Sequence, residues 1–211
     1  WAFSPVKDSL PPTTVDRTWA RNDIDRYLLA NMESAGIVPV KDAGRESLLR
    51  RIYLAVIGLP PTVSQIRLFV SDDRSIEEIL PEVVDELMAS SHFGERWGRH
   101  WLDVARFAES SGGGRSLMFP EAWRFRDYVI DAYNQDKPFD QFIVEQIAGD
   151  LLTHDSHQQK TERLVATGLL ALGPTNYEQQ DKELLRMEVI DEQIDTVGRA
   201  FLGLTLGCAR C

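Results

Sequence analysis

The only two cysteines of the chain are Cys208 and Cys211, three positions apart at its C-terminal end. A Cys-x-x-Cys pair followed by histidine is the attachment sequence for c-type haem, in which both thiols bond to the porphyrin and the histidine ligates iron. We therefore expect Cys208 and Cys211 to bind c-type haem in a longer parent protein whose next residue is histidine. The 211-residue chain stops within this motif, so we do not expect it to retain haem by itself.

Other functions of the Cys208/Cys211 pair require sequence features that this chain lacks. A thioredoxin-like dithiol follows a βαβ pattern, which this sequence lacks. A structural zinc site needs four ligands, and there is no second Cys-x-x-Cys to complete one, so we expect no metal site. An incidental pair of thiols, or a reversible disulfide, remains the alternative.

A second group of reactive side chains lies on one predicted helix. His100 and Asp103 are three residues apart and share a helix face, with Arg106 on the neighbouring turn. A carboxylate beside a histidine fixes which ring nitrogen carries the proton, as in a general base, a metal ligand or an anion pocket. We expect His100 to share a pocket with Asp103 or Arg106. The alternative is a structural lattice of ion pairs around Trp97 and Trp101, both of which we expect to be buried.

A third group combines arginines with aromatic residues. Arg124 and Asp127 are again three residues apart, and Arg124 and Arg126 alternate with the aromatic residues Trp123 and Phe125. Such an arrangement can form a stacking surface, so Arg124, Arg126 and Asp127 are candidates for a further pocket. The alternative is that these side chains simply tie helices together.

The elements that must position these residues are predicted to be helices. Residues 1–20 contain three prolines and read as an extended lead-in. Helix caps then recur, and no period-two strand pattern is visible. We expect an all-α fold: an irregular, multi-helix single domain over residues 1–211. The expected caps and stops are Asn22, Thr62 with Gln65, Ser75 with Glu78, Gly36 and Gly58, and we expect Pro81 near a helix start.

The last predicted helix shows the clearest periodicity. A heptad-like apolar stripe is expected to face the core, with acidic residues on the solvent face. The stripe consists of Met187, Ile190, Ile194, Val197, Phe201 and Leu204, and the acidic residues are Glu188, Asp191, Glu192 and Asp195.

Composition excludes several classes of partner. The net charge is −10, whereas nucleic-acid-binding surfaces are basic, so we expect no nucleic-acid partner. No apolar run is long enough to span a bilayer, so we expect no transmembrane segment. The glycines at 112–114 follow a helix and read as a hinge or a lid rather than a phosphate-binding loop.

Several short motifs, in order along the whole chain, carry a resemblance to a known family. They are Trp1-Ala2-Phe3, Asn22-x-Ile24-Asp25-Arg26-Tyr27, Gly58-Leu59-Pro60-Pro61-Thr62, Gly94-Glu95-Arg96-Trp97-x-x-His100-Trp101-Leu102-Asp103-x-Ala105-Arg106, Trp123-Arg124-x-Arg126-Asp127-Tyr128 and Gly203-Leu204-Thr205-x-Gly207-Cys208-Ala209-Arg210-Cys211. Together they resemble the cytochrome-associated domain of unknown function that is abundant in planctomycete bacteria. In that family the final cysteine is followed by His-Asp-His-Lys.

The resemblance implies a large exported protein, located in the periplasm or cell envelope. It implies as partners a cytochrome-c-like module upstream and an uncharacterised C-terminal domain downstream in the same parent chain. It also implies a role in redox chemistry or a polysaccharide-related substrate, without defining a reaction.

Three functions remain open from the sequence. The first is a domain that holds or borders a c-type haem for electron transfer. The second is a non-catalytic scaffold or glycan-binding module. The third is part of an oxidative or hydrolytic enzyme completed by a C-terminal domain, with His100 and Asp103 as acid/base residues.

Overall fold

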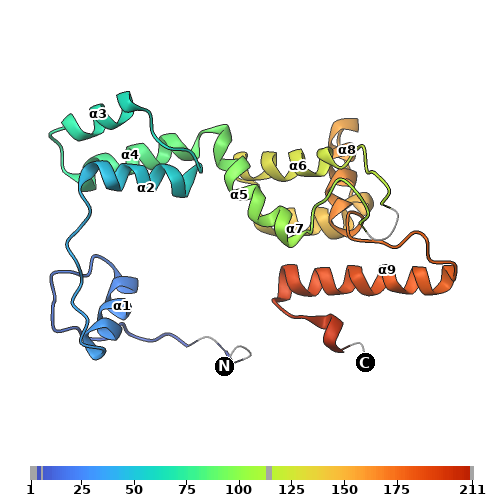
Figure 1. Ribbon diagram of the computed structural model, residues 1–211, viewed down its shortest axis with the longest axis horizontal. Helices are drawn as coiled ribbons and strands as arrows, with labels where there is room; N and C mark the ends of the chain where they lie inside the picture. The colour runs from blue at the N-terminus through green and yellow to red at the C-terminus, as the bar shows by residue number, and fades with distance from the viewer. Residues whose placement is uncertain (1–3, 6, 113–115, 210–211) are drawn as a thin grey trace. The chain divides into compact units, whose positions relative to one another are not determined.

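A computed structural model describes residues 4–5, 7–112 and 116–209 of the chain. Within these residues the regular structure is helical, and the sole β-type contact is an isolated bridge between Ser110 and Met118 (Figure 1). The all-α prediction is therefore confirmed. None of the helices in the described part is long and apolar enough to cross a membrane.

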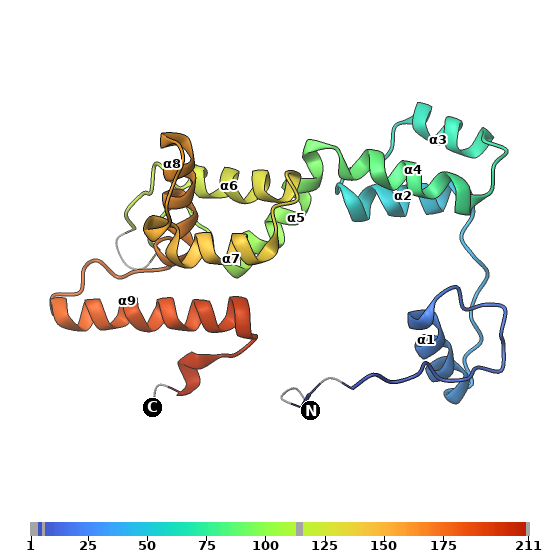
Figure 2. The ribbon, with the colours of Figure 1, turned by 180° about the vertical axis from the view of Figure 1, so that it is seen from behind.

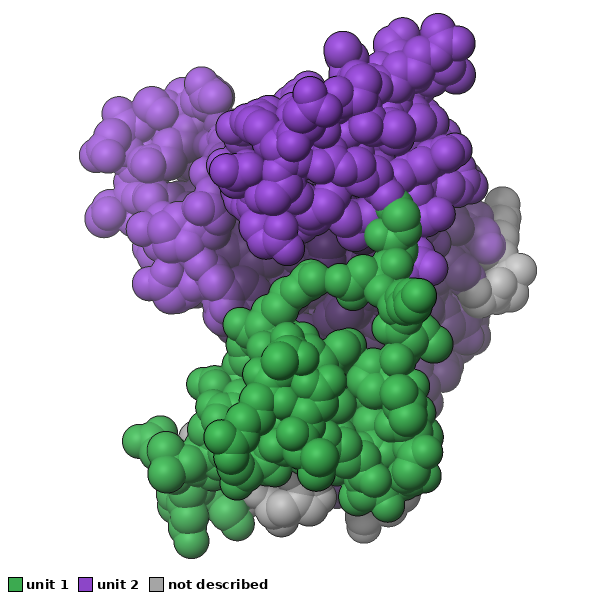
Figure 3. Space-filling model, turned by 90° about the vertical axis from the view of Figure 1, so that its left-hand side faces the viewer, with its two compact units in different colours: residues 1–44 green, residues 45–211 purple. Residues whose placement is uncertain are grey.

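The chain forms two compact units, residues 1–44 and 45–211, coloured separately in Figure 3. The expectation of one domain over residues 1–211 did not include this division. The boundary falls between Gly44 and Arg45, directly before the helix that begins at Arg45. The sequence there offers little local signal of a boundary.

The first unit contains the helix α1 (Asp23–Ser34) and the lead-in. Asn22 caps the helix, and its side chain and that of Asp25 satisfy each other's backbone N–H groups. The described residues of the lead-in contain no helix, as predicted, and the Glu33 carboxylate accepts from the N–H groups of Val15 and Asp16 at 3.0 Å. Gly36 follows the helix with a φ of +67°, which a glycine adopts without strain.

The second unit begins with three helices around a small core of their own. They are α2 (Arg45–Val56), α3 (Val63–Ser71) and α4 (Ile76–Met88). The buried side chains of this core are Leu49, Tyr53, Phe69, Ile79 and Leu87. The predicted capping boxes are present at the starts of α3 and α4.

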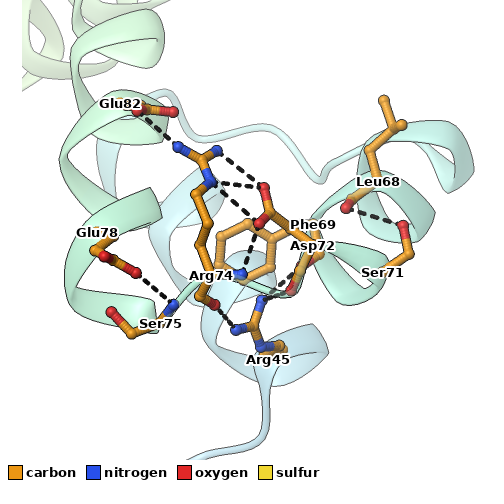
Figure 4. A network of polar contacts seen from close by, with 9 residues as sticks. All are labelled: Arg45, Leu68, Phe69, Ser71, Asp72, Arg74, Ser75, Glu78 and Glu82. Carbon is orange, nitrogen blue, oxygen red and sulfur yellow. Dashed lines mark hydrogen bonds and ion pairs between the residues drawn. The ribbon is translucent and has the colours of Figure 1, made fainter.

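Arg45 and Arg74 hold the turn between α3 and α4 (Figure 4). The Arg45 guanidinium donates to the carbonyls of Phe69, at 3.1 Å, and Asp72, at 2.8 Å, which satisfies groups that the end of α3 leaves unpaired. Arg74 binds the Asp72 carboxylate at 2.9 Å through one guanidinium nitrogen and Glu82 at 2.9 Å through another. Side chains far apart in sequence thus replace a local C-terminal cap on α3.

Pro81 lies inside α4 rather than at its start, so that prediction was wrong. Its ring removes the N–H that would bond to the carbonyl of Glu77, in the first turn of the helix. The capping box at Ser75 and the burial of Ile79 and Leu87 hold the helix despite this loss.

Four further helices form the larger core of the second unit. They are α5 (Ser91–Val104), α6 (Trp123–Asn134), α7 (Phe139–Ala148) and α8 (His157–Ala166). In Figure 2, α8 crosses the ends of α6 and α7, and it contacts both helices. Short 3-10 turns, η1 (Gly149–Leu151) and η2 (Thr167–Leu170), border α8.

Trp101 is a central residue of this core. It is 7% exposed, its indole N–H donates to the buried Gln146 side chain at 2.8 Å, and its ring meets that of Phe142 at 5.0 Å. Trp97, one turn earlier, is 40% exposed and donates to the carbonyl of Val56. The prediction of burial was therefore right for Trp101 and wrong for Trp97, which packs against the end of α2.

Helices α5 and α6 approach closely at two glycines. A Cβ atom on Gly94 would lie 2.6 Å from Cγ of Asn134 and would strike the backbone carbonyl of Ile130. The Gly94 N–H instead donates to the Asn134 side chain at 2.8 Å. At Gly98 a Cβ atom would lie 3.4 Å or more from Val129 and Ile130, an ordinary van der Waals distance.

The last helix, α9 (Lys182–Val197), continues directly into a π-helical turn, η3 (Gly198–Leu202). A 3-10 turn, η4 (Leu206–Ala209), follows after a short connection. Its predicted orientation was wrong in part. Met187 and Ile194 of the apolar stripe are 50% and 51% exposed, whereas Glu192 and Asp195, expected on the solvent face, are largely covered. Polar partners on neighbouring segments account for this orientation.

The hinge predicted at residues 112–114 falls partly outside the described residues, since Gly113 and Gly114 are not among them. Ser111, directly before it, is fully buried, and its N–H donates to the carbonyl of Leu117 at 2.9 Å.

We predict opposite outcomes for alanine at the two glycines of α5. Gly94→Ala is expected to lower the free energy of unfolding by about 1–3 kcal/mol, because the added methyl group meets fixed backbone. Gly98→Ala is expected to be neutral or to stabilise by up to about 1 kcal/mol, because it removes a flexible residue from a helix without a clash. Chemical denaturation of both variants measures the difference. Equal effects of the two substitutions would contradict the close approach at Gly94.

We predict a pH-dependent contribution from the turn after α3. Hydrogen bonds from Arg74 lower the pKa of Asp72 from 3.8 to about 2. A carboxylate whose pKa is depressed by folding stabilises above its unfolded pKa, and this stability is lost as the pH falls through the folded value. Asp72→Asn should therefore lower Tm at neutral pH, and the difference should shrink between about pH 4 and pH 2. Asp73→Asn, at the exposed neighbour, is the control and should leave Tm nearly unchanged throughout.

Candidate functional site

Arg106 leaves the end of α5 and reaches α9. Its backbone has a φ of +53°, a left-handed conformation that turns the chain sharply after the helix. The guanidinium forms an ion pair with Glu192 and donates to the carbonyl of Leu169 at 3.4 Å. Only 17% of the Arg106 side chain is exposed, and burial, followed by the nearby charge of Arg199, lowers the pKa of Arg106.

Glycine makes room for this ion pair. A Cβ atom on Gly173 would lie 2.5 Å from a carboxylate oxygen of Glu192 and 2.6 Å from a guanidinium nitrogen of Arg106. Gly173 lies in the segment between η2 and α9, so the pair is enclosed from a third side. Any larger residue there would displace one of the two charges.

A second ion pair joins α9 to η3, closer to the cysteine motif. Asp195 pairs with Arg199 and also accepts a hydrogen bond from the N–H of Gly207 at 2.7 Å. The charges of Asp195 and Arg199 both act on Arg106. We call Arg106, Glu192, Asp195 and Arg199 the α9 charge cluster; it links the end of α5 to the turn that carries Cys208.

Backbone geometry also folds this turn against α9. Gly203, after the π-helical turn, has a φ of +64°, and the N–H of Leu204 returns to the carbonyl of Gly198 at 3.1 Å. The side chain of Leu206 packs so closely on Gly198 that a Cβ atom there would lie 2.7 Å from it. Cys208 follows in η4 as an exposed free thiol. Cys211 lies outside the described residues.

His100 and Asp103 do not form the expected pair. Both side chains are exposed, and Asp103 accepts from Arg99, one turn earlier, at 2.9 Å. The His100 ring instead lies beside the Trp97 ring, at 5.5 Å between centroids. Asp103 thus has a closer cationic partner on its own helix, and Arg106 turns away to α9. Of the three candidates on this segment, the structure connects only Arg106 to the cysteine motif.

Arg124, Arg126 and Asp127 separate in a similar way. Arg124 lies over the ring of Trp123, with 4.8 Å from its guanidinium carbon to the centroid, while Arg126 pairs with its neighbour Asp127 at 2.8 Å. Arg124 and Asp127 line a cleft of about 270 Å³ between α6 and α8, together with Trp123. Arg126 is not among the residues that line it.

Sequence reasoning missed a buried carboxylate beside this cleft. Glu145 of α7 is 8% exposed and accepts from Lys137 at 2.6 Å and from the Tyr128 hydroxyl at 2.8 Å, with Arg163 at 3.6 Å. Burial alone would raise the pKa of Glu145, but the bonds from Lys137 and Tyr128 outweigh it and leave the pKa below its usual range. No spacing rule joins positions 137, 145 and 163, because they come from three separate segments.

The α9 charge cluster was also missed. The spacing of Asp195 and Arg199 by four residues predicts a pair on one helix face, and this was the available signal. The contact between Arg106 and Glu192 had no local signal, because 86 positions separate the two. Within the residues that the structure describes, no group of three or more His, Cys, Asp or Glu could hold a metal ion.

Comparison with known proteins assigns the greater part of the chain to a family. A family model described as "PSCyt2: Protein of unknown function (DUF1549)" matches residues 23–211. No curated protein and no solved structure matches the chain.

We predict that Asp195 holds the turn that carries Cys208. Asp195→Ala should accelerate amide hydrogen exchange at Gly207 by on the order of tenfold, because a hydrogen bond to a charged acceptor is lost. Asp195→Asn, which keeps an oxygen acceptor but breaks the ion pair with Arg199, should have a smaller effect. Glu183→Ala, at the exposed start of α9, is the control. An unchanged exchange rate at Gly207 in Asp195→Ala would contradict this role.

Proposed function

The chain belongs to the PSCyt2 family of proteins of unknown function, and from this premise we propose that it is a domain that holds or borders a c-type haem for electron transfer. In this proposal the domain is part of an exported protein of the periplasm or cell envelope. Its partners are a cytochrome-c-like module and a C-terminal domain of the same parent chain.

The observation that carries the proposal is the placement of Cys208. Its thiol is exposed, on a short turn that Asp195 and the Leu206–Gly198 contact hold against α9. A thiol that is accessible on an ordered turn can react with a group outside the domain, whereas a buried thiol is inert. Cys208 and Cys211 would hold the haem through thioether bonds, and the haem would supply one-electron transfer.

The thioether bonds join the cysteines to the porphyrin rather than to the iron, so the proposal also needs a histidine that ligates the iron. Of the four histidines, His92 and His100 lie on α5, while His154 and His157 lie before and at the start of α8. His92 is already bonded to Glu95 at 2.8 Å. The spacing of Cys208 and Cys211 fits the attachment chemistry of c-type haem, and the histidine expected after Cys211 is the residue on which the proposal depends.

The described residues have a supporting role in this proposal. Asp195 fixes the backbone one residue before Cys208, and its pairing with Arg199 balances its charge. Arg106 and Glu192 attach α9 to the core, so a group bound at the turn would be in contact with a rigid element rather than a free tail. Leu184, Met187 and Ile194, all exposed on α9, support a contact with another domain of the parent.

The test uses the parent protein, including the residues after Cys211, produced in a host that attaches c-type haem. We expect a red protein with a Soret band that survives denaturation, because thioether bonds are covalent. The variant with serine at both Cys208 and Cys211 should fold but remain colourless. A cytochrome c matured in the same host serves as the positive control.

A parent protein that is folded and colourless while the control cytochrome is red would overturn the proposal. In that case the second candidate, a scaffold or glycan-binding module, becomes the better one. It is favoured by the cleft between α6 and α8, where Trp123 is 42% exposed beside Arg124 and Asp127. Exposed aromatic rings next to hydrogen-bonding side chains suit sugar binding through stacking and polar contacts.

The third hypothesis, an oxidative or hydrolytic enzyme with His100 and Asp103 as acid/base residues, has less support. That pairing is not formed, since Asp103 binds Arg99 and His100 faces Trp97.

A further inference from the structure

A pocket of about 290 Å³ lies where the start of α5, the end of α6 and the start of α7 meet. Four aromatic side chains line it: Phe93, Tyr133, Phe139 and Phe142. We call it the aromatic pocket. It shares no residue with the Cys208 turn or the α9 charge cluster, so what it binds is independent of the proposed haem.

The aromatic rings of the pocket form a connected set. Phe142 meets Tyr133 at 6.3 Å and Phe139 at 6.3 Å between centroids. Phe142 is buried, whereas Phe139 is 60% exposed, so the pocket has a fixed wall and an accessible one. Aromatic faces carry partial negative charge, and several of them around one space attract a cation.

One carboxylate stands beside these rings without a cationic partner. Asp136 lines the pocket and is exposed, and none of the described lysines or arginines forms an ion pair with it. The next residue, Lys137, is occupied: it binds Glu145 at 2.6 Å and lies 4.7 Å from the centroid of the Tyr128 ring. Lys137 also lines the pocket, but its charge is neutralised by Glu145, whereas the charge of Asp136 is not neutralised by an ion pair.

The backbone at Asp136 makes this carboxylate unusual. Its φ is +48°, and it sits just past the end of α6, where the N–H of Lys137 returns to the carbonyl of Ala132 at 2.9 Å. Helices that end in this way usually have glycine at the left-handed position. The chain instead carries aspartate there, at a conformational cost, and this places a negative charge at the edge of the aromatic pocket.

We propose that the aromatic pocket binds a small organic cation, an alkylated or quaternary ammonium group, between its rings and the Asp136 carboxylate. The volume suits a ligand of this size, because it lies at the lower end of the range for small-molecule sites. The net charge of −10 favours the approach of cations over anions.

The test is calorimetric titration of the full chain with choline and with its neutral carbon isostere, dimethylbutanol. The two have nearly the same shape, so only the charge differs. Choline should bind at least about fivefold more tightly, because the rings and the carboxylate act on the charge. Equal affinities would show a merely apolar pocket, and no binding of choline would show no site; either result overturns the proposal.

Variants at Asp136 separate binding from stability. Asp136→Asn keeps a residue that tolerates the left-handed backbone, and Asp136→Gly relieves its strain and should raise Tm. Both should weaken choline binding by about fivefold. Asp140→Asn removes a carboxylate from the first turn of α7 that does not line the pocket, and should leave binding unchanged. Equal weakening by Asp140→Asn and Asp136→Asn would reduce the effect to general charge and overturn the proposal.

The aromatic wall is tested at its exposed side. Phe139→Ala should weaken choline binding by a similar factor while changing Tm little, because the ring is more than half exposed. Unchanged binding in this variant would also contradict the proposed site.

Discussion

The close approach of α5 and α6 at Gly94 is the constraint on which the larger core depends. Because that residue lacks a side chain, Asn134 can bond to the α5 backbone at two places, the N–H of Gly94 and the carbonyl of Ser91. The two helices are thereby fixed in register. With the helices in this register, Trp101 of α5 can donate to Gln146, and Arg106, just after α5, can form its ion pair with Glu192 of α9. Both the aromatic pocket and the α9 charge cluster lie at the edges of this helix pair.

Polar side chains, rather than apolar ones, determine how α9 packs. Thr196 is buried and bonds within its own helix, Gln193 donates to the carbonyl of Leu170, and Glu192 meets Arg106. Breaking a covered ion pair on one side costs more than the pair itself contributes, because the remaining charge is left unpaired. These contacts therefore specify the position of α9, and leave part of its apolar stripe exposed to a partner.

Features encoded within a few residues could be predicted from the sequence, and features that depend on distant segments could not. The caps at Asn22, Thr62 and Ser75 each need only a side chain and the next three backbone groups, and all three were predicted. Trp97 and Trp101 are four residues apart and so share one face of the helix. Helical periodicity therefore could not tell which of the two side chains would be buried. For the candidate site, the expected partner of Asp103 was displaced by Arg99, an equally local competitor, and the partner of Arg106 came from another helix.

The π-helical turn at Gly198–Leu202 has a consequence for the direction in which the chain leaves α9. An α-helix turns by roughly 100° per residue, and a π-helical turn advances less per residue, so the angular phase changes across it. The stripe seen in α9 therefore does not continue in phase to Phe201, whose ring packs against Trp101 at 5.7 Å. The direction in which Cys208 is presented therefore depends on the length of this π-helical turn as much as on the composition of α9. Relatives that differ by one residue there would present the same thiol toward a different side.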